Sequence, residues 1–325
     1  MKKACAILTG DIEIRAFQPT CRTDDHWEAQ QNKMDWLREL SYEHDCVIFD
    51  SGDLFDKRYK SNPSHKLINW AIENLPNSGK GALGDGAPSF YTVPGNHDLP
   101  GKSIDNYDNS AMAVLAAAGT LIRMPNRFPM GYQPHGRNIN IYGHAWGEEL
   151  KHSDKFNDKS INVGIIHAMV YEEFEPFPGC EGYSAKEVMD LLPDYDLILT
   201  GHNHQTFTLE KEGRVLVNPG SFMRNDADQE DHKPCVFLWY SETNTIKRVY
   251  IPIEQGVISR DHIDIKNAKE TRLDAFVEKL GGQAVSGVNF HANLEAAVND
   301  DLITKAVKDK IWRYYEGGYN EISCN

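Results

Sequence analysis

The chain has 325 residues, of which 40% are hydrophobic and 25% are charged, and its formal net charge is −14 at pH 7. This composition is typical of an ordinary globular protein, and the length allows one large domain with an appendage. No apolar run approaches the roughly 20 residues that span a membrane. The negative charge argues against a general nucleic-acid coat, although it is compatible with a local phosphate-binding surface.

The six cysteines are scattered through the chain and include no C-x-x-C pair. This distribution argues against a disulfide framework and against a cysteine zinc site, and it favours a reducing compartment. The apolar stretch near the N-terminus is too short for a secretory signal, and we expect it to form the first core strand. We therefore expect a cytoplasmic protein with no membrane segment.

Hydrophobic periodicity predicts helices alternating with strands in the first half of the chain and mainly short strands from residue 196 to 252. The predicted helices cover residues 25–44, 64–75, 110–118 and 184–192. The predicted strands cover residues 4–9, 46–50, 89–93, 139–143, 162–167, 196–200, 205–210, 214–218, 235–240 and 247–252. This mixture favours an α/β protein with two packed sheets over a single doubly wound sheet.

The pattern changes near Ile253, where the strands end. Residues 268–280 and 292–315 have helical patterns, and Gly281 and Gly282 separate them. We expect a main domain over residues 1–255 and a small, mainly helical appendage over residues 256–325.

The stretch from Val47 to Asp56 reads Val-Ile-Phe-Asp-Ser-Gly-Asp-Leu-Phe-Asp. Its apolar start predicts a buried strand, and Gly52 allows a sharp turn that is followed by Asp53 and Asp56. In open α/β sheets, ligands bind outside the carboxyl ends of the strands. An acidic turn in solvent explains this stretch equally well when it is taken alone.

Four more segments follow predicted strands and carry side chains that can bind metals. They are Thr9-Gly10-Asp11-Ile12-Glu13, Val93-Pro94-Gly95-Asn96-His97-Asp98, Gly164-Ile165-Ile166-His167-Ala168 and Leu199-Thr200-Gly201-His202-Asn203-His204. Each segment alone is also explained by a tight turn or a structural histidine. The role of His144 stays open.

In this order, the five segments resemble the motifs of the calcineurin-like metallophosphoesterase superfamily: D-x-H, G-D-x-x-D, G-N-H-D/E, a lone histidine at a strand end, and G-H-x-H. Four of the motifs match, and the first departs because Glu13 stands where the family has histidine. The resemblance covers about residues 9–204. It implies a catalytic domain over residues 1–255, built as a four-layer α-β-β-α sandwich of two mixed sheets, with two divalent metals where the strand ends converge.

The resemblance also implies a role for each matching residue. It places Asp11, Asp53 and His204 on the first metal, and Asp53, Asn96, His167 and His202 on the second. A metal-bridging hydroxide would be the nucleophile. His97 would stabilise the developing charge and protonate the leaving group, with Asp56 orienting it.

Glu13 leaves two interpretations open. Its carboxylate can bind the first metal through oxygen, and the added negative charge would favour Mn²⁺ or Mg²⁺ over softer ions. Alternatively, Glu13 lies outside the ligand set and the first metal binds weakly. We expect Mn²⁺ as the cofactor, with Mg²⁺, Fe²⁺ and Zn²⁺ as alternatives.

The segment Gly95–Pro100 resembles the SbcD-type DNA repair nuclease subunits, in which proline follows soon after the third motif. Asn218-Pro219-Gly220-Ser221 occurs there and also in small phosphodiesterases of the superfamily. Phosphoprotein phosphatases are disfavoured, because Lys57-Arg58 and Asp98 stand where they have Arg-Gly and Glu. Lys57 and Arg58 are candidates for binding a nucleic-acid backbone, and a solvated basic turn is the alternative.

The sequence thus predicts a two-metal phosphodiesterase, and specifically a DNA exo- or endonuclease of the SbcD-like kind, with an SbcC-type ATPase as a candidate partner. One alternative is a phosphodiesterase or phosphatase that acts on small nucleotides or other phosphoesters. Another is an inactive member of the fold that serves as a protein-binding scaffold. The sequence does not indicate an oligomeric state.

Overall fold

The computed structural model describes residues 3–56, 63–76, 80–81, 84–85, 89–126, 130–132, 134, 137–150, 160–261, 263, 265, 294–295, 298 and 303–322. The chain packs as two compact units, Met1–Ser259 and Arg260–Asn325. The first unit ends in a segment that is held by backbone hydrogen bonds to the N-terminal part of the same unit. There, Ser259 N donates to Cys21 O at 2.6 Å, and Thr23 N donates to Val257 O at 3.0 Å.

Within the described residues, the first unit contains two six-stranded sheets. The first sheet has the order β16-β15-β1-β2-β5-β6, in which β1, β2, β5 and β6 run parallel and β15 is antiparallel to both of its neighbours, β1 and β16. Its strands are β1 (Ala6–Thr9), β2 (Val47–Asp50), β5 (Phe90–Thr92), β6 (Ile122–Arg123), β15 (Cys235–Tyr240) and β16 (Thr245–Tyr250).

The second sheet has the order β13-β14-β12-β9-β8-β7. Its four central strands run parallel, and both edge strands are antiparallel to their neighbours. Its strands are β7 (Met130–Tyr132), β8 (Ile139–His144), β9 (Ile161–His167), β12 (Leu197–Gly201), β13 (Phe207–Lys211) and β14 (Arg214–Asn218).

The two sheets pack face to face over a core of buried apolar side chains. Leu8, Phe49 and Trp239 from the first sheet belong to the same buried cluster as Ile141 and Val163 from the second. Strands buried on both faces need nearly continuous apolar sequence, which is what the central strands carry.

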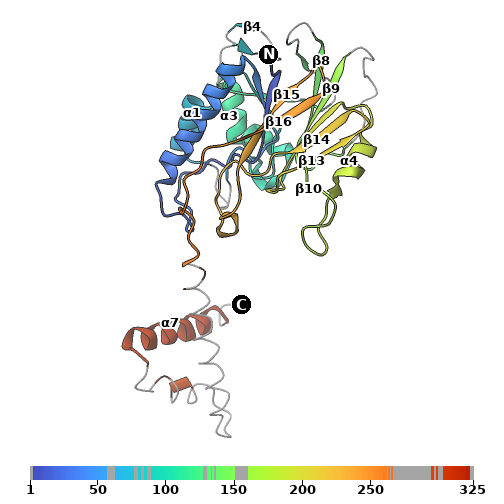
Figure 1. Ribbon diagram of the computed structural model, residues 1–325. Helices are drawn as coiled ribbons and strands as arrows, with labels where there is room; N and C mark the ends of the chain where they lie inside the picture. The colour runs from blue at the N-terminus through green and yellow to red at the C-terminus, as the bar shows by residue number, and fades with distance from the viewer. Residues whose placement is uncertain are drawn as a thin grey trace. The chain divides into compact units, whose positions relative to one another are not determined.

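Helices cover the outer face of each sheet (Figure 1). α1 (His26–His44), α2 (His65–Asn74) and α3 (Ala111–Ala117) pack their apolar residues on the first sheet, and α4 (Ala185–Leu191) packs on the second. These layers confirm the predicted four-layer α-β-β-α sandwich of two mixed sheets.

The helices begin where the sequence predicts, because each has a polar residue that caps its first turn. The side chain of Asp25 accepts from Glu28 N at the start of α1 at 3.1 Å. Ser184 and Glu187 form a capping box at the start of α4. Several elements were not predicted because they are too short to show a periodicity. They are η1 (Pro100–Lys102), η2 (Ile104–Asn109), η4 (Ala227–Gln229), β3 (Lys80–Gly81), β4 (Gly84–Asp85), β10 (Val170–Tyr171) and β11 (Tyr183–Ser184), together with the sheet strands β6 and β7.

The described part of the second unit is dominated by α7 (Lys305–Ile322). Within the range predicted as one helix, residues 292–315, the described residues 294, 295 and 298 are helical, residues 303 and 304 are not, and α7 then runs from Lys305 beyond the predicted end to Ile322. The helix predicted over residues 268–280 lies outside the described residues. Of the helices in the described ranges, none combines the length and the apolar character needed to cross a bilayer.

Candidate metal centre

The predicted metal-binding residues meet at one edge of the molecule, because the strands that precede them are parallel. Asp11 follows β1, Asp53 follows the neighbouring β2, and Asn96 follows β5. In the second sheet, His167 ends β9 and His202 follows its neighbour β12. The carboxyl ends of both sheets therefore contribute side chains to the same place.

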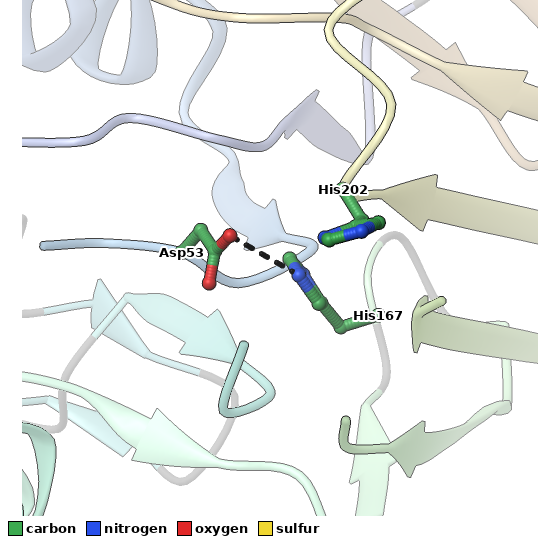
Figure 2. A group of neighbouring side chains, drawn as sticks. All are labelled: Asp53, His167 and His202. Atoms are coloured by element: carbon green, nitrogen blue, oxygen red, sulfur yellow. Dashed lines mark ion pairs between the residues drawn. The ribbon is translucent and has the colours of Figure 1, made fainter. Parts of the chain in front are cut away.

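The first group of side chains is centred on His167 (Figure 2). Ligand atoms of Asp53, His167 and His202 all lie within 4.8 Å of one another. His167 Nε2 is 3.3 Å from Asp53 Oδ2 and 3.2 Å from Asn96 Oδ1. His167 Nδ1 donates to the carbonyl of Ser51 at 2.7 Å. This second bond fixes the ring so that Nε2 faces Asp53 and Asn96, as is usual for metal-binding histidines.

The second group contains Glu13, the residue that departs from the family motif. Glu13 Oε1 is 3.6 Å from His204 Nε2, and Asp11 Oδ1 is 4.0 Å from the same nitrogen. Asn225 Nδ2 donates to the other Glu13 oxygen at 3.3 Å. The Glu13 carboxylate thus points inward, which fits the interpretation that places it among the ligands.

The backbone at the metal centre has an uncommon conformation. Asp11, Glu13, Asp53 and His202 have φ angles of 46°, 50°, 52° and 78°. Side chains other than glycine rarely adopt this left-handed region, and such residues cluster at functional sites. Hydrogen bonds between the loops hold it in place, because Asp11 N donates to Gly52 O at 3.0 Å and Glu13 N donates to Asp53 O at 2.9 Å.

Two glycines are required by close approach. A Cβ on Gly95 would lie 2.1 Å from Asp53 Oδ1, and one on Gly52 would lie 2.7 Å from His167 Nδ1. Both distances are too short for any side chain, so these glycines allow the loops to meet around Asp53.

Burial and neighbouring charges shift the pKa values of the side chains in the centre. Burial raises the pKa of Asp11 to about 7. Burial also opposes ionisation of Asp53, but the nearby His167 charge and hydrogen bond outweigh it and hold the pKa of Asp53 well below its usual range. For His167, burial acts to lower the pKa, and the Asp53 carboxylate reverses this and raises it to about 10. Burial lowers the pKa of His202 to about 4.

The donor set therefore fits divalent cations. Asp11, Glu13 and Asp53 are three buried carboxylates in one small region. Isolated carboxylates are costly to bury, and hard dications bind oxygen ligands of this kind.

His97 lies at the solvent edge of the centre, with its side chain 26% exposed. Its Nδ1 is 3.4 Å from Glu13 Oε1 and 3.7 Å from Asp53 Oδ2. Partial burial acts to lower the pKa of His97, but the Glu13 hydrogen bond and the Asp53 charge raise it to about 9. Ligand atoms of Glu13, Asp56 and His97 lie within 4.8 Å of one another, and Asp56 also pairs with Arg15 at 2.9 Å.

Comparison with protein families identifies the family of the chain. A model described as calcineurin-like phosphoesterase matches residues 7–206. The chain belongs to the calcineurin-like phosphoesterase family. Members of this family hydrolyse phosphoesters and normally bind two divalent metals.

The individual proteins that resemble this chain do so over part of their length or at low sequence identity. A "probable metallophosphoesterase" from Methanothermobacter thermautotrophicus is 34% identical over 76 residues, which is 23% of this chain and 40% of that protein. A solved archaeal phosphodiesterase is 12% identical, with 75% of this chain and 98% of that chain covered and a TM-score of 0.37. A 5'-nucleotidase precursor from Thermus thermophilus is 11% identical. The match covers 84% of this chain and 59% of that chain, with a TM-score of 0.42. The chain thus spans about three fifths of that nucleotidase.

Two further residues of the phosphoesterase centre were not predicted. The carboxylate of Asp98 accepts from Gly95 N at 2.9 Å, Phe55 N at 3.1 Å and Leu54 N at 3.3 Å. It therefore ties the third motif to the second. An acidic residue directly after the Asn-His pair was the available signal for this role.

Trp146 is the second of these residues. Its ring centroid is 4.7 Å from that of His202 and 6.1 Å from that of His167. Trp146 N also donates to Pro94 O at 2.9 Å. No motif marks this tryptophan, and the only signal was an aromatic residue just after a predicted strand.

His144 and the basic pair are the remaining candidates from the sequence. His144 is buried, and its Nε2 lies 3.0 Å from the hydroxyl of Tyr195. Burial lowers its pKa to about 4, so it acts as a core residue. Lys57 and Arg58 lie outside the described residues.

The protonation states predict how metal binding depends on pH. At pH 7, His167 with a pKa of about 10 is protonated, and Asp11 with a pKa of about 7 is half protonated. Because metal ligands must be deprotonated, Mn²⁺ binding should release protons, and its affinity should rise by about tenfold or more per pH unit between pH 6 and 8. Calorimetry in two buffers of different ionisation enthalpy measures both quantities. An affinity that does not change over this range would mean that His167 does not bind metal.

Proposed function

We propose that the protein is a two-metal phosphodiesterase whose substrate is DNA. The observation that carries this proposal is the meeting of three buried carboxylates with a half-buried histidine at the solvent edge, namely Asp11, Glu13, Asp53 and His97. The buried acids suit two cations, and the half-buried imidazole of His97 is accessible to a substrate from the solvent side.

Two ligand sets are proposed around a shared carboxylate. The first is Asp11, Glu13, Asp53 and His204, and the second is Asp53, Asn96, His167 and His202. When bound in such a site, divalent metals supply Lewis acidity toward phosphoryl oxygens and an activated nucleophile.

His97 is proposed to give its proton to the leaving oxygen. Its contacts with Glu13 and Asp53 hold the ring at the edge of the centre, where it faces solvent on one side. Asp56 is proposed to orient His97, as part of the group of Glu13, Asp56 and His97 whose ligand atoms lie together.

Support for DNA as the substrate comes from the sequence around the centre. Gly95–Pro100 resembles the SbcD-like nucleases, and Lys57 and Arg58 follow Asp56 directly, where two positive charges suit a phosphate backbone. An SbcC-type ATPase remains the proposed partner.

A small phosphodiester is the second candidate, and the charge of the protein favours it. The net charge is −14, and acidic pairs follow the centre's aromatic and histidine residues, with Glu148-Glu149 after Trp146 and Glu172-Glu173 after His167. A protein of this net charge repels an extended polyanion more than it repels a single nucleotide.

Glu13→Ala tests the first ligand set. We expect the bound Mn²⁺ to fall from two ions per chain to one, since the second set keeps all its ligands. Glu13→His should keep two ions and shift the preference toward softer metals such as Zn²⁺. Metal analysis after equilibrium dialysis measures the number, and Glu210→Ala, on the exposed side of β13, is the control. Two ions bound to Glu13→Ala with the parent's affinity would place Glu13 outside the ligand set.

His97→Asn tests the proton donor. Both metals should stay bound. Hydrolysis of an ester with an alkyl leaving group should slow by about 10²–10⁴-fold, because that oxygen needs a proton. Hydrolysis of a nitrophenyl ester should slow much less, because nitrophenolate leaves without one. An equal loss for both esters, measured under saturating Mn²⁺, would assign His97 to charge stabilisation instead.

A panel of substrates tests the proposed function itself. We expect Mn²⁺-dependent cleavage of single-stranded or duplex DNA, together with hydrolysis of bis-p-nitrophenyl phosphate. Joint replacement of Lys57 and Arg58 by alanine should weaken DNA cleavage and spare the small ester. Removal of residues 260–325 leaves the first unit complete through Ser259. This truncation should likewise weaken DNA cleavage and spare the small ester. Rapid cleavage of small esters without DNA cleavage would favour the second candidate, and no turnover of any substrate would favour a scaffold.

A further inference from the structure

A cavity separate from the metal centre lies in the first unit. None of the described residues that line it is a predicted metal ligand. It encloses about 260 Å³ between the segment that precedes α1, α1 itself, the loop after β14 and the segment after β16. Its walls include Arg22, Lys33, Trp36 and Arg224. The proposed function does not use this cavity.

The cavity carries three cations that are almost completely buried. Arg22, Lys33 and Arg224 are 8%, 6% and 2% exposed. The carboxylates in the same wall are those of Asp24, which pairs with Arg22, and of the exposed Glu254. Buried cations are rarely retained without compensation, so an excess of positive charge in a protein of net charge −14 calls for an explanation.

All three side-chain nitrogens of Arg22 donate, Nε and Nη2 to Asp24 and Nη1 to the carbonyl of Arg224 at 3.2 Å. Lys33 and Arg224 leave donors available. Lys33 Nζ donates to the carbonyl of Phe222 at 2.8 Å, which is the one acceptor found for its three protons within the described residues. The two terminal nitrogens of Arg224 donate to the carbonyls of Glu230 at 3.1 Å and Glu254 at 2.5 Å. The buried Nε of Arg224 has no acceptor among the described residues.

The cations also repel one another. Burial, together with the charges of Arg22 and Arg224, lowers the pKa of Lys33 to about 7. Burial and the charge of Arg22 likewise lower the pKa of Arg224. An anion placed among them would relieve both effects, since an opposite charge favours the ionised form of each group.

We propose that this cavity binds the phosphoryl group of a small molecule, separately from the metal centre. Guanidinium and ammonium groups together suit a phosphate dianion, whereas a carboxylate would neutralise less of the charge. The volume exceeds that of one phosphate, and the Trp36 ring in the wall offers a surface for the rest of the ligand. Inorganic phosphate and a nucleoside monophosphate both carry this phosphoryl group, so both are candidate ligands of the cavity.

The cavity and the metal centre share neighbouring residues. Phe222, which accepts from Lys33, donates through its backbone N to Asp11 O at 3.1 Å. Arg224 precedes Asn225, whose Nδ2 donates to Glu13 and whose Oδ1 lies 2.9 Å from His26 Nε2. Asn225 therefore lies between a cavity residue and a proposed metal ligand.

The test uses the full chain after metal removal with a chelator, so that phosphate has no metal to bind. Calorimetry with inorganic phosphate and with adenosine monophosphate, at constant ionic strength in chloride, should give saturable binding at one site per chain. Lys33→Met, which keeps the side-chain volume, should weaken binding about tenfold or more. Lys186→Met, on the exposed face of α4, should leave it unchanged.

A second variant covers the case in which Lys33→Met does not fold. Asn32 is exposed at the cavity wall, so Asn32→Asp adds a negative charge without disturbing the core and should also weaken binding. Monophosphate binding that is tighter than phosphate binding in the parent, but equal to it in Trp36→Leu, would identify a nucleotide ligand. Equal affinities throughout would identify phosphate. No saturable binding to the parent, or binding unchanged in Asn32→Asp and in folded Lys33→Met, would overturn the proposal.

Discussion

Asp11, Glu13 and Asp53 are buried within one small region, and the burial of these carboxylates constrains everything around them. Acids are costly to remove from water, and backbone amides offset part of this cost. His202 N donates to both oxygens of Asp11 at 2.9 and 3.1 Å, and His97 N donates to Asp53 Oδ1 at 2.8 Å. These two carboxylates are thus bonded to the loops of other motifs, so the motif loops hold one another in place.

The metal centre therefore depends on the packing of the two sheets. His167, at the end of β9, donates to Ser51, which follows β2 in the other sheet. Trp146 N bonds to Pro94 O, and Phe222 N bonds to Asp11 O at 3.1 Å. The bonds of His167 with Ser51 and of Trp146 with Pro94 join strand ends of different sheets. The apolar core that joins the sheets consequently also sets the distances between the histidines of one sheet and the carboxylates of the other.

Much of this arrangement could be predicted from the sequence. Apolar runs such as Val47–Phe49 predicted the buried strands, capping residues such as Asp25 and Ser184 predicted the helix starts, and the motif order predicted which residues meet. The left-handed backbone at Asp11 and Glu13 could not be predicted, because it is imposed by bonds between loops and not by the residue types. Trp146, and the cavity formed by Arg22 and Arg224, were missed because their partners are distant in the sequence.

We propose that Asp53 is shared by two metals in one centre. Electron paramagnetic resonance of the Mn²⁺-loaded protein tests it directly, because two manganese ions bridged by one carboxylate are magnetically coupled. We expect the spectrum of a coupled dimanganese pair once two equivalents of Mn²⁺ have been added per chain. A spectrum of isolated, uncoupled Mn²⁺ at full occupancy would contradict it.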